Sequence, residues 1–170
     1  ERSGYTWHFR GSHAPPFSGL DYGTAILSRT PLDGARSRPF HQNWRDAKGY
    51  VEARLELGST EVDVLSVHLD FLRAEIRRRQ SLALFDRFHE RRRPILVLGD
   101  LNSTWFEGVG ELATKLGLQA WKCADGEPTW PRRRPFRRLD WILATGELVI
   151  HQQWQAHDPI SDHAAVIAEV

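Results

Sequence analysis

The sequence has no methionine and a single cysteine in 170 residues. Cys123 cannot form a disulfide within the chain, and it cannot build a zinc site alone. We therefore expect it to pack as a small, partly buried apolar residue. Because the chain begins at Glu1 and contains no methionine, we interpret it as a fragment or a processed product.

Long apolar runs are also absent, so no segment of the sequence is expected to insert stably in a membrane. Hydrophobic residues make up 41% and charged residues 26%, which is typical of a globular protein. This length suits one compact domain, and we expect a single domain over residues 1–170. The arginine-rich, cysteine-poor composition favours a bacterial, cytoplasmic protein, and it leaves the oligomeric state open.

Lysine is scarce, since arginine accounts for 20 of the 23 basic residues. The arginines cluster in residues 77–79, 91–93, 132–134 and 137–138. A guanidinium group binds phosphate through two parallel hydrogen bonds, whereas a lysine ammonium acts as a point charge. A GC-rich genome explains the same preference, and the formal net charge of +1 shows that the chain as a whole is not a polycation.

Hydrophobic periodicity indicates a mixture of strands and helices. Residues 1–20, rich in Gly, Ser, Pro and His, are expected to form a loop. Period-two alternation and short apolar runs predict the strands, and a broader apolar periodicity predicts the helices. The expected strands are 21–28, 49–57, 62–69, 95–98, 138–144, 148–154 and 164–170, and the expected helices are 73–91 and 108–116. Such a mixture predicts a layered α/β domain.

The first candidate for chemistry follows the apolar strand over residues 95–98. Asp100 and Asn102 are two positions apart, and in an extended chain such residues point the same way. A carboxylate and a carboxamide in one cleft suit a hard cation or a phosphate group. A simple turn is the alternative explanation, because Asp and Asn are both common turn residues.

Two further polar residues interrupt or end apolar strands. Asp140 lies inside an apolar segment, where a carboxylate is costly unless it is paired. A salt bridge with Arg137 or Arg138 is the structural explanation, and a catalytic role is the functional one. His68 ends the strand over 62–69, where a histidine that packs in the core is the common case.

A third cluster, Ser-Asp-His at residues 161–163, places a carboxylate beside an imidazole. Such a pair can bind a metal ion, or the carboxylate can tune the pKa of the histidine. Taken alone, a capped loop with an incidental histidine explains the cluster equally well. Each of these signals is weak by itself, and the order in which they occur carries more information.

Five motifs follow one another along the chain: Gly-Thr-Ala-Ile-Leu-Ser-Arg at 23–29, Ser-Val-His-Leu at 66–69, Leu-Gly-Asp-Leu-Asn-Ser at 98–103, Arg-Leu-Asp-Trp-Ile at 138–142 and Ser-Asp-His at 161–163. In this order they closely resemble the endonuclease/exonuclease/phosphatase superfamily, and the resemblance covers about residues 21–170. It implies an α-β-β-α sandwich of two facing sheets, with an active site between the sheets at one end.

The resemblance also implies roles for individual residues. His163 would be the catalytic imidazole, and Asp140 would orient it by hydrogen bonding to its other ring nitrogen. Asp100 would position or deprotonate the attacking water. Asn102 would hold a nonbridging phosphate oxygen, and His68 would donate a hydrogen bond to the phosphate.

A divalent cation belongs to this chemistry. Asp162 resembles the metal-ligating aspartate of the family, and with Asp100 it predicts Mg²⁺ or Mn²⁺ as the cofactor, because both offer oxygen ligands. The family also carries an asparagine and a metal-ligating glutamate before the strand that ends at residue 28. Only about twenty residues precede that strand, with Glu1 at the extreme end. Either Glu1 is the remnant of that strand or the glutamate is missing. We expect the glutamate and the N-terminal strands of the sandwich to be missing.

The expected activity is hydrolysis of phosphodiesters or phosphomonoesters, with nucleic acid as the leading substrate class. Trp130 could stack on a base, and Arg137 and Arg138 adjoin the strand of Asp140 and could contact phosphate. The arginines of the helix over 73–91 are expected to form a solvated outer face. A catalytically incomplete domain that binds nucleic acid or acts as a scaffold is the alternative, and a lipid or inositol phosphate phosphoesterase is the second alternative.

Overall fold

The computed structural model of the protein describes residues 4–14, 19, 21–40, 48–120, 126–156 and 160–170. Its centre is a six-stranded sheet with the order β3-β4-β5-β6-β8-β7. The strands of this sheet are β3 (Asp33–Pro39), β4 (Gly49–Leu57), β5 (Thr60–His68), β6 (Ile95–Asp100), β7 (Leu118–Ala120) and β8 (Asp140–Thr145). β5 and β6 are parallel, and every other pair of neighbours in this sheet is antiparallel.

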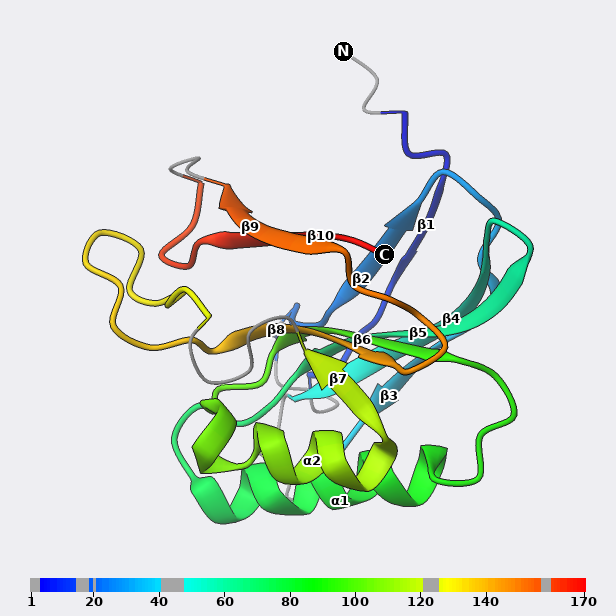
Figure 1. Ribbon diagram of the computed structural model, residues 1–170. Coiled ribbons are helices and arrows are strands. Elements are labelled where there is room, and N and C mark those ends of the chain that lie inside the picture. Colours follow the sequence, from blue (N-terminus) through cyan, green and yellow to red (C-terminus); the bar gives the residue numbers. More distant parts are fainter. Residues whose placement is uncertain (1–3, 15–18, 20, 41–47, 121–125, 157–159) are drawn as a thin grey trace.

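The six-stranded sheet is covered on both faces. Figure 1 shows α1 (Ala74–Phe88) and α2 (Val109–Leu116) on one face, with a short 3-10 helix, η1 (Trp105–Glu107), before α2. On the other face lie two two-stranded sheets, β1 (Trp7–Arg10) with β2 (Ala25–Ser28), and β9 (Gln152–Ala156) with β10 (Ala165–Glu169). This arrangement confirms the predicted mixed α/β sandwich. In the described part of the chain, helices cover only the outer face of the six-stranded sheet.

Alternating side chains of the central strands feed two separate cores. Leu65 and Val67 of β5 belong to the core under the helices, while Val62 and Val64 belong to the core between the sheets. The neighbouring strands β6 and β8 alternate in the same way. Since successive residues of a strand point to opposite faces, polar residues in register at the strand ends also lie on a common face.

The strand β4 departs from the predicted half-buried pattern, because its first five residues are buried. Glu52 carries a charge and is nevertheless only 8% exposed. It accepts hydrogen bonds from Arg38 and Arg87 at 3.0 and 3.1 Å. Burial raises the pKa of Glu52, and the two guanidinium groups more than offset this effect, so that its pKa is lowered overall. The alternation therefore located the strand correctly, but it did not predict that α1 covers the face of β4 that carries Glu52.

Several predicted boundaries are corrected. Residues 1–20 were expected to be a loop, yet β1 lies within them and pairs antiparallel with β2. The strand expected over 21–28 starts at Ala25, and the one expected over 148–154 starts at Gln152. The strand β3 was not predicted, because its sequence, Asp-Gly-Ala-Arg-Ser-Arg-Pro, carries almost no apolar signal. Both predicted helices are confirmed, and the predicted strands 49–57 and 62–69 correspond to the antiparallel pair β4–β5.

Glu1 and Cys123 lie outside the described residues, as does most of the segment 15–20. The expectation that N-terminal strands and a metal-ligating glutamate are missing therefore stays a prediction. Among the described residues, no helix is long and apolar enough to span a membrane.

Gly99 allows the central strands to approach one another closely. Its φ is +143°, which residues with a side chain rarely adopt, and a Cβ atom built there would lie 2.0 Å from the carbonyl oxygen of Val67. Any side chain at this position would force β6 away from β5. Because Asp100 follows directly, this glycine also sets the position of the next polar residue.

We predict that Gly99→Ala destabilises the protein by about 3 kcal/mol, the upper range for a strained backbone conformation, since the added methyl group clashes with backbone. The measurement is the free energy of unfolding in urea. Gly146→Ala is the matched control, because the nearest atom to its new Cβ, the side-chain nitrogen of Gln119, lies 3.5 Å away. Equal stability of the two variants would contradict this account of the β5–β6 contact.

Candidate active site

Three polar residues stand in one row across the central sheet. His68 is the register partner of Asp100 across the parallel pair β5–β6, and Asp100 is the register partner of Asp140 across β6–β8. His68 and Asp100 end their strands, and Asp140 begins its own. Counting alternate positions from each residue along its own strand leads to residues of the core between the sheets, namely Val64, Leu98 and Ile142, so all three project toward that layer.

His163 approaches this row from the segment before β10. Its Nδ1 lies 2.7 Å from Oδ2 of Asp140, which is a strong hydrogen bond. The partner of Asp140 is therefore His163. Arg137, offered above as the structural explanation for Asp140, pairs instead with Glu107, and the guanidinium of Arg138 lies 4.0 Å from the Trp141 ring centroid.

Thr129 links the segment that carries Asp140 to the segment that carries His163. Its side chain is fully buried, and its Oγ1 accepts hydrogen bonds from the backbone N–H groups of Leu139 and Asp140 at 3.0 and 3.2 Å. Its carbonyl oxygen accepts from the N–H of Ala164 at 2.9 Å. One residue thus fixes both the start of β8 and the residue after His163, which explains how side chains 23 positions apart meet.

The surroundings of His163 favour its protonated form. Burial lowers the pKa of its imidazole, but the hydrogen bond and the negative charge of Asp140 outweigh that effect, with further help from Asp100 and Asp162. The net result is a raised pKa for His163. A protonated imidazole in this place can donate a hydrogen bond to an anionic group.

The surroundings of Asp100 disfavour its charged form, since its carboxylate lies close to that of Asp140. Burial, and then the charge of Asp140, raise the pKa of Asp100 to about 6. Its Oδ1 accepts a hydrogen bond from the backbone N–H of Asn102 at 2.9 Å. A carboxyl group with a pKa of about 6 is ionised at neutral pH and is still basic enough to accept a proton.

Asn102 reaches the site by a turn and not by an extended chain. β6 ends at Asp100, and Asn102 adopts a left-handed conformation with φ of 48°. Its Nδ2 donates to the carbonyl oxygen of Leu69 at 3.0 Å. The expectation that both side chains point the same way along a strand is therefore wrong, and the alternative, a turn, is correct. The two residues are nevertheless neighbours through the Asp100 carboxylate.

His68 is enclosed by two residues that the sequence analysis missed. Nζ of Lys48 lies 2.6 Å from Nε2 of His68, and the hydroxyl of Tyr22 lies 2.6 Å from its Nδ1. Burial, then the charges of Lys48 and His163, lower the pKa of His68 to about 3, so its imidazole is neutral. One signal could have identified Lys48, since it is one of only three lysines and directly precedes a buried strand.

The donor set fits a divalent cation. Asp100, Asp140 and His163 each offer one ligand atom, and these atoms lie within 4.8 Å of one another. Two neighbouring carboxylates, one with a raised pKa, would be relieved by a bound positive charge. Asp162 does not join this group. Its side chain is exposed, and its Oδ1 accepts a 3.4 Å hydrogen bond from the hydroxyl of Ser161.

Of the remaining residues predicted to contact substrate, Trp130 lies beside the site, whereas Arg137 and Arg138 have other partners. The ring of Trp130 lies 6.4 Å from that of His163, so this residue flanks the site. Arg138 is only 6% exposed and stacks on Trp141, a residue of the core under the helices. Arg137 forms its ion pair with Glu107. Neither the ion pair of Arg137 with Glu107 nor the contact of Arg138 with Trp141 involves the Asp140–His163 pair.

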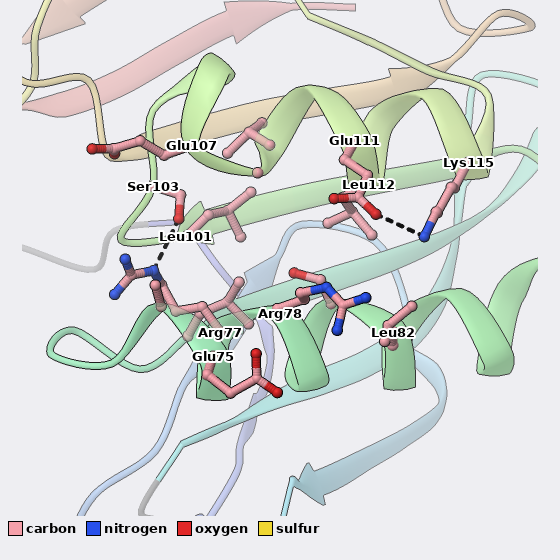
Figure 2. Close-up of a pocket in the computed structure, with 15 residues that line it drawn as sticks. Glu75, Arg77, Arg78, Leu82, Leu101, Ser103, Glu107, Glu111, Leu112 and Lys115 are labelled. Atoms are coloured by element: carbon pink, nitrogen blue, oxygen red, sulfur yellow. Dashed lines mark hydrogen bonds and ion pairs between the residues drawn. The ribbon is translucent and has the colours of Figure 1, made fainter.

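Two cavities differ in their position relative to the site. A largely apolar one of about 460 Å³ adjoins Asp140 and His163 and is lined in part by Leu98, Ile142 and Ile160. Another, of about 210 Å³, lies between α1 and α2, where Figure 2 shows the Arg77–Ser103 hydrogen bond and the Glu111–Lys115 ion pair. Of these two, only the first opens beside the Asp140–His163 pair.

Comparison with known families agrees with this geometry. The family model described as "Endonuclease/Exonuclease/phosphatase family" matches residues 2–163. The chain therefore belongs to the endonuclease/exonuclease/phosphatase family. No protein with curated annotation matches the chain.

Solved structures share the fold at low sequence identity. A family protein from Leptotrichia buccalis is 16% identical with a TM-score of 0.75, and the match covers 96% of this chain and 70% of that one. A family protein from Beutenbergia cavernae is 20% identical with a TM-score of 0.78, and the match covers 97% of this chain and 53% of that one. TDP2 from D. rerio, complexed with a single strand DNA product, is 15% identical with a TM-score of 0.74, covering 95% of this chain and 75% of that one.

We predict that Asp140→Asn lowers the pKa of His163 in the metal-free protein, because the hydrogen bond to a carboxylate and its negative charge are both removed. The imidazole should then lose its proton at a lower pH than in the wild type, as followed by an NMR titration of the His163 ring. Asp162→Asn is the matched control and should lower this pKa less, since Asp162 contributes least of the three carboxylates. Equal decreases in both variants would show that Asp140 does not hold His163.

Proposed function

We propose that the protein hydrolyses phosphate esters with the help of a divalent cation, and that nucleic acid is its substrate class. The observation that carries this proposal is the hydrogen-bonded Asp140–His163 pair beside Asp100 in one row of the sheet. The family includes hydrolases of this type, and the row contains an acid with a raised pKa, an imidazole that favours its proton, and a set of ligands for a cation.

The reaction would proceed by attack of water on phosphorus. As the new P–O bond forms, Asp100 accepts the proton of the water, and the bond to the leaving oxygen breaks. His163, held by Asp140, donates a hydrogen bond to a phosphoryl oxygen whose negative charge grows in the transition state. The leaving oxygen then takes a proton from solvent. The second N–H of the Asn102 carboxamide donates a hydrogen bond to a nonbridging oxygen of the phosphate.

Mg²⁺ or Mn²⁺, when bound, would neutralise charge on the phosphate. Asp100 and Asp140, whose carboxylates belong to the group described above, would hold the cation. Asp162, which lies outside that group, is a further proposed ligand from the segment that carries His163. Magnesium keeps several water ligands in sites of this kind, so two carboxylates are sufficient to hold it.

Nucleic acid is favoured by two features around the site. Trp130 offers an aromatic face beside His163, and base stacking on such a face is worth about 1–3 kcal/mol. TDP2 from D. rerio, which has the same fold, was solved with a single strand DNA product.

We predict that Mg²⁺ or Mn²⁺ supports hydrolysis of bis-p-nitrophenyl phosphate and of single-stranded DNA, and that His163→Ala lowers kcat by about 10²–10³-fold, the usual loss on removing one preorganised donor to a developing charge. His89→Ala is the matched control, because His89 is exposed at the end of α1. It should retain wild-type turnover.

The contrary outcomes separate the alternatives. Turnover that survives His163→Ala would exclude this mechanism. Salt-dependent binding of DNA without turnover at any metal concentration would favour the catalytically incomplete binding domain. Turnover of lipid or inositol phosphates with DNA left intact would reassign the substrate class and keep the chemistry.

A further inference from the structure

The cluster of Tyr22, Lys48 and His68 has no role in the reaction as outlined above. Nζ of Lys48 lies 2.6 Å from both the Tyr22 hydroxyl oxygen and Nε2 of His68. The same hydroxyl oxygen lies 2.6 Å from Nδ1 of His68. Lys48 is only 8% exposed, and its ammonium group also lies 4.8 Å from the centre of the Tyr22 ring. The three groups therefore form a closed triangle of hydrogen bonds beside Asp100.

The chemistry of the three groups determines which atom donates in each contact. A lysine ammonium has donors and no acceptor, so Nε2 of His68 must accept its hydrogen bond. A neutral imidazole carries its single proton on the other nitrogen, which places the proton of His68 on Nδ1. That N–H then donates to the Tyr22 oxygen.

The Tyr22 oxygen consequently accepts two hydrogen bonds, one from Lys48 and one from His68. Its own proton must point elsewhere, because Nε2 of His68, at 3.4 Å, is already occupied by Lys48. Burial and the charge of Asp100 raise the pKa of Tyr22 to about 12, so the hydroxyl keeps this proton at neutral pH. Within the described residues, no other acceptor lies within hydrogen-bond distance of the Tyr22 hydroxyl.

The position of the cluster indicates which group can accept the hydrogen bond from the Tyr22 hydroxyl. Tyr22 is half-buried, and its hydroxyl contacts His68, the residue in register with Asp100. A phosphate bound between Asp100 and His163 would bring an anionic oxygen to this side of the row. Two donors directed at the Tyr22 oxygen also polarise its O–H bond, which strengthens the hydrogen bond it can give.

We propose that the hydroxyl of Tyr22 donates a hydrogen bond to a nonbridging phosphate oxygen of the substrate, and that His68 and Lys48 are positioning residues that aim it. The inference rests on the proposed phosphoesterase function. It changes the role implied for His68 by the family resemblance, because both ring nitrogens of His68 are engaged within the cluster.

Tyr22→Phe tests the proposal, since it removes the hydroxyl and keeps the ring under Lys48. We predict a fall in kcat of about 10²-fold or more for bis-p-nitrophenyl phosphate, the loss expected on removing one preorganised donor to a developing charge. Tyr5→Phe is the matched control, because Tyr5 is 49% exposed and contacts Arg29 only through its ring. This control should retain wild-type turnover.

A second measurement tests the geometry without turnover. The tautomer of His68 is read from ¹⁵N NMR of the histidine-labelled, metal-free protein, and the predicted form carries its proton on Nδ1. In Lys48→Met the population with the proton on Nε2 should rise, because Nε2 no longer has to accept a hydrogen bond from an ammonium group. A purely structural role of Lys48 would leave the tautomer unchanged.

The outcomes separate this inference from the proposed function. An active wild type with Tyr22→Phe within twofold of it would overturn the inference and leave the phosphoesterase standing, as would a His68 proton on Nε2 in the wild type. If the wild type shows no turnover, the proposed function fails. Binding of inorganic phosphate then decides the inference, which requires weaker binding in Tyr22→Phe and is overturned by equal binding.

Discussion

The register of three adjacent strands is the constraint on which the site depends. β5, β6 and β8 are aligned so that His68, Asp100 and Asp140 meet in one row at one end of the sheet. Gly99 makes this alignment possible, since its missing side chain lets β6 approach the backbone of β5. A shift of one residue in any of these strands would turn its polar residue to the helix side, among apolar side chains.

Charges alternate around this row in a way that suits the proposed phosphate chemistry. Lys48 lies on one side of Asp100, and the protonated form of His163 is favoured on the other, so two positive groups flank two carboxylates. The low pKa of His68 follows from its burial beside Lys48, and it keeps one side of the site from gaining a further charge. The result is a centre that can hold both a cation and an anionic substrate within one cleft.

Much of this could be predicted from the sequence, because the motifs are local. Asp100, Asp140 and His163 each lie in a short segment whose neighbours identify it, and hydrophobic alternation located the strands of the central sheet except β3 and β7. The contacts of Tyr22 and Lys48 with His68 could not be predicted, since they join residues 46 and 20 positions apart. Neither belongs to a pattern that periodicity detects.

The predictions that proved wrong also failed because of contacts that the local sequence pattern does not reveal. Asn102 was expected in an extended chain, and the turn that Asp100 caps with its own carboxylate overrides the strand. Arg138 looked available for phosphate because it adjoins Asp140, but it precedes β8, is only 6% exposed and places its guanidinium over the Trp141 ring. The strand β1 escaped prediction because its four residues are stabilised by pairing with β2, which local composition does not reveal.

The most direct test of the central claim is a titration of the ¹⁵N-labelled protein with Mn²⁺, followed through paramagnetic broadening of backbone amide signals. If the row at the ends of β6 and β8 holds the cation, the amides around Asp100, Asp140 and His163 will broaden first. The acidic residues at the α1–α2 cavity, Glu75 and Glu111, provide the internal comparison. Broadening that begins at those two residues, with the row unaffected, would contradict the account.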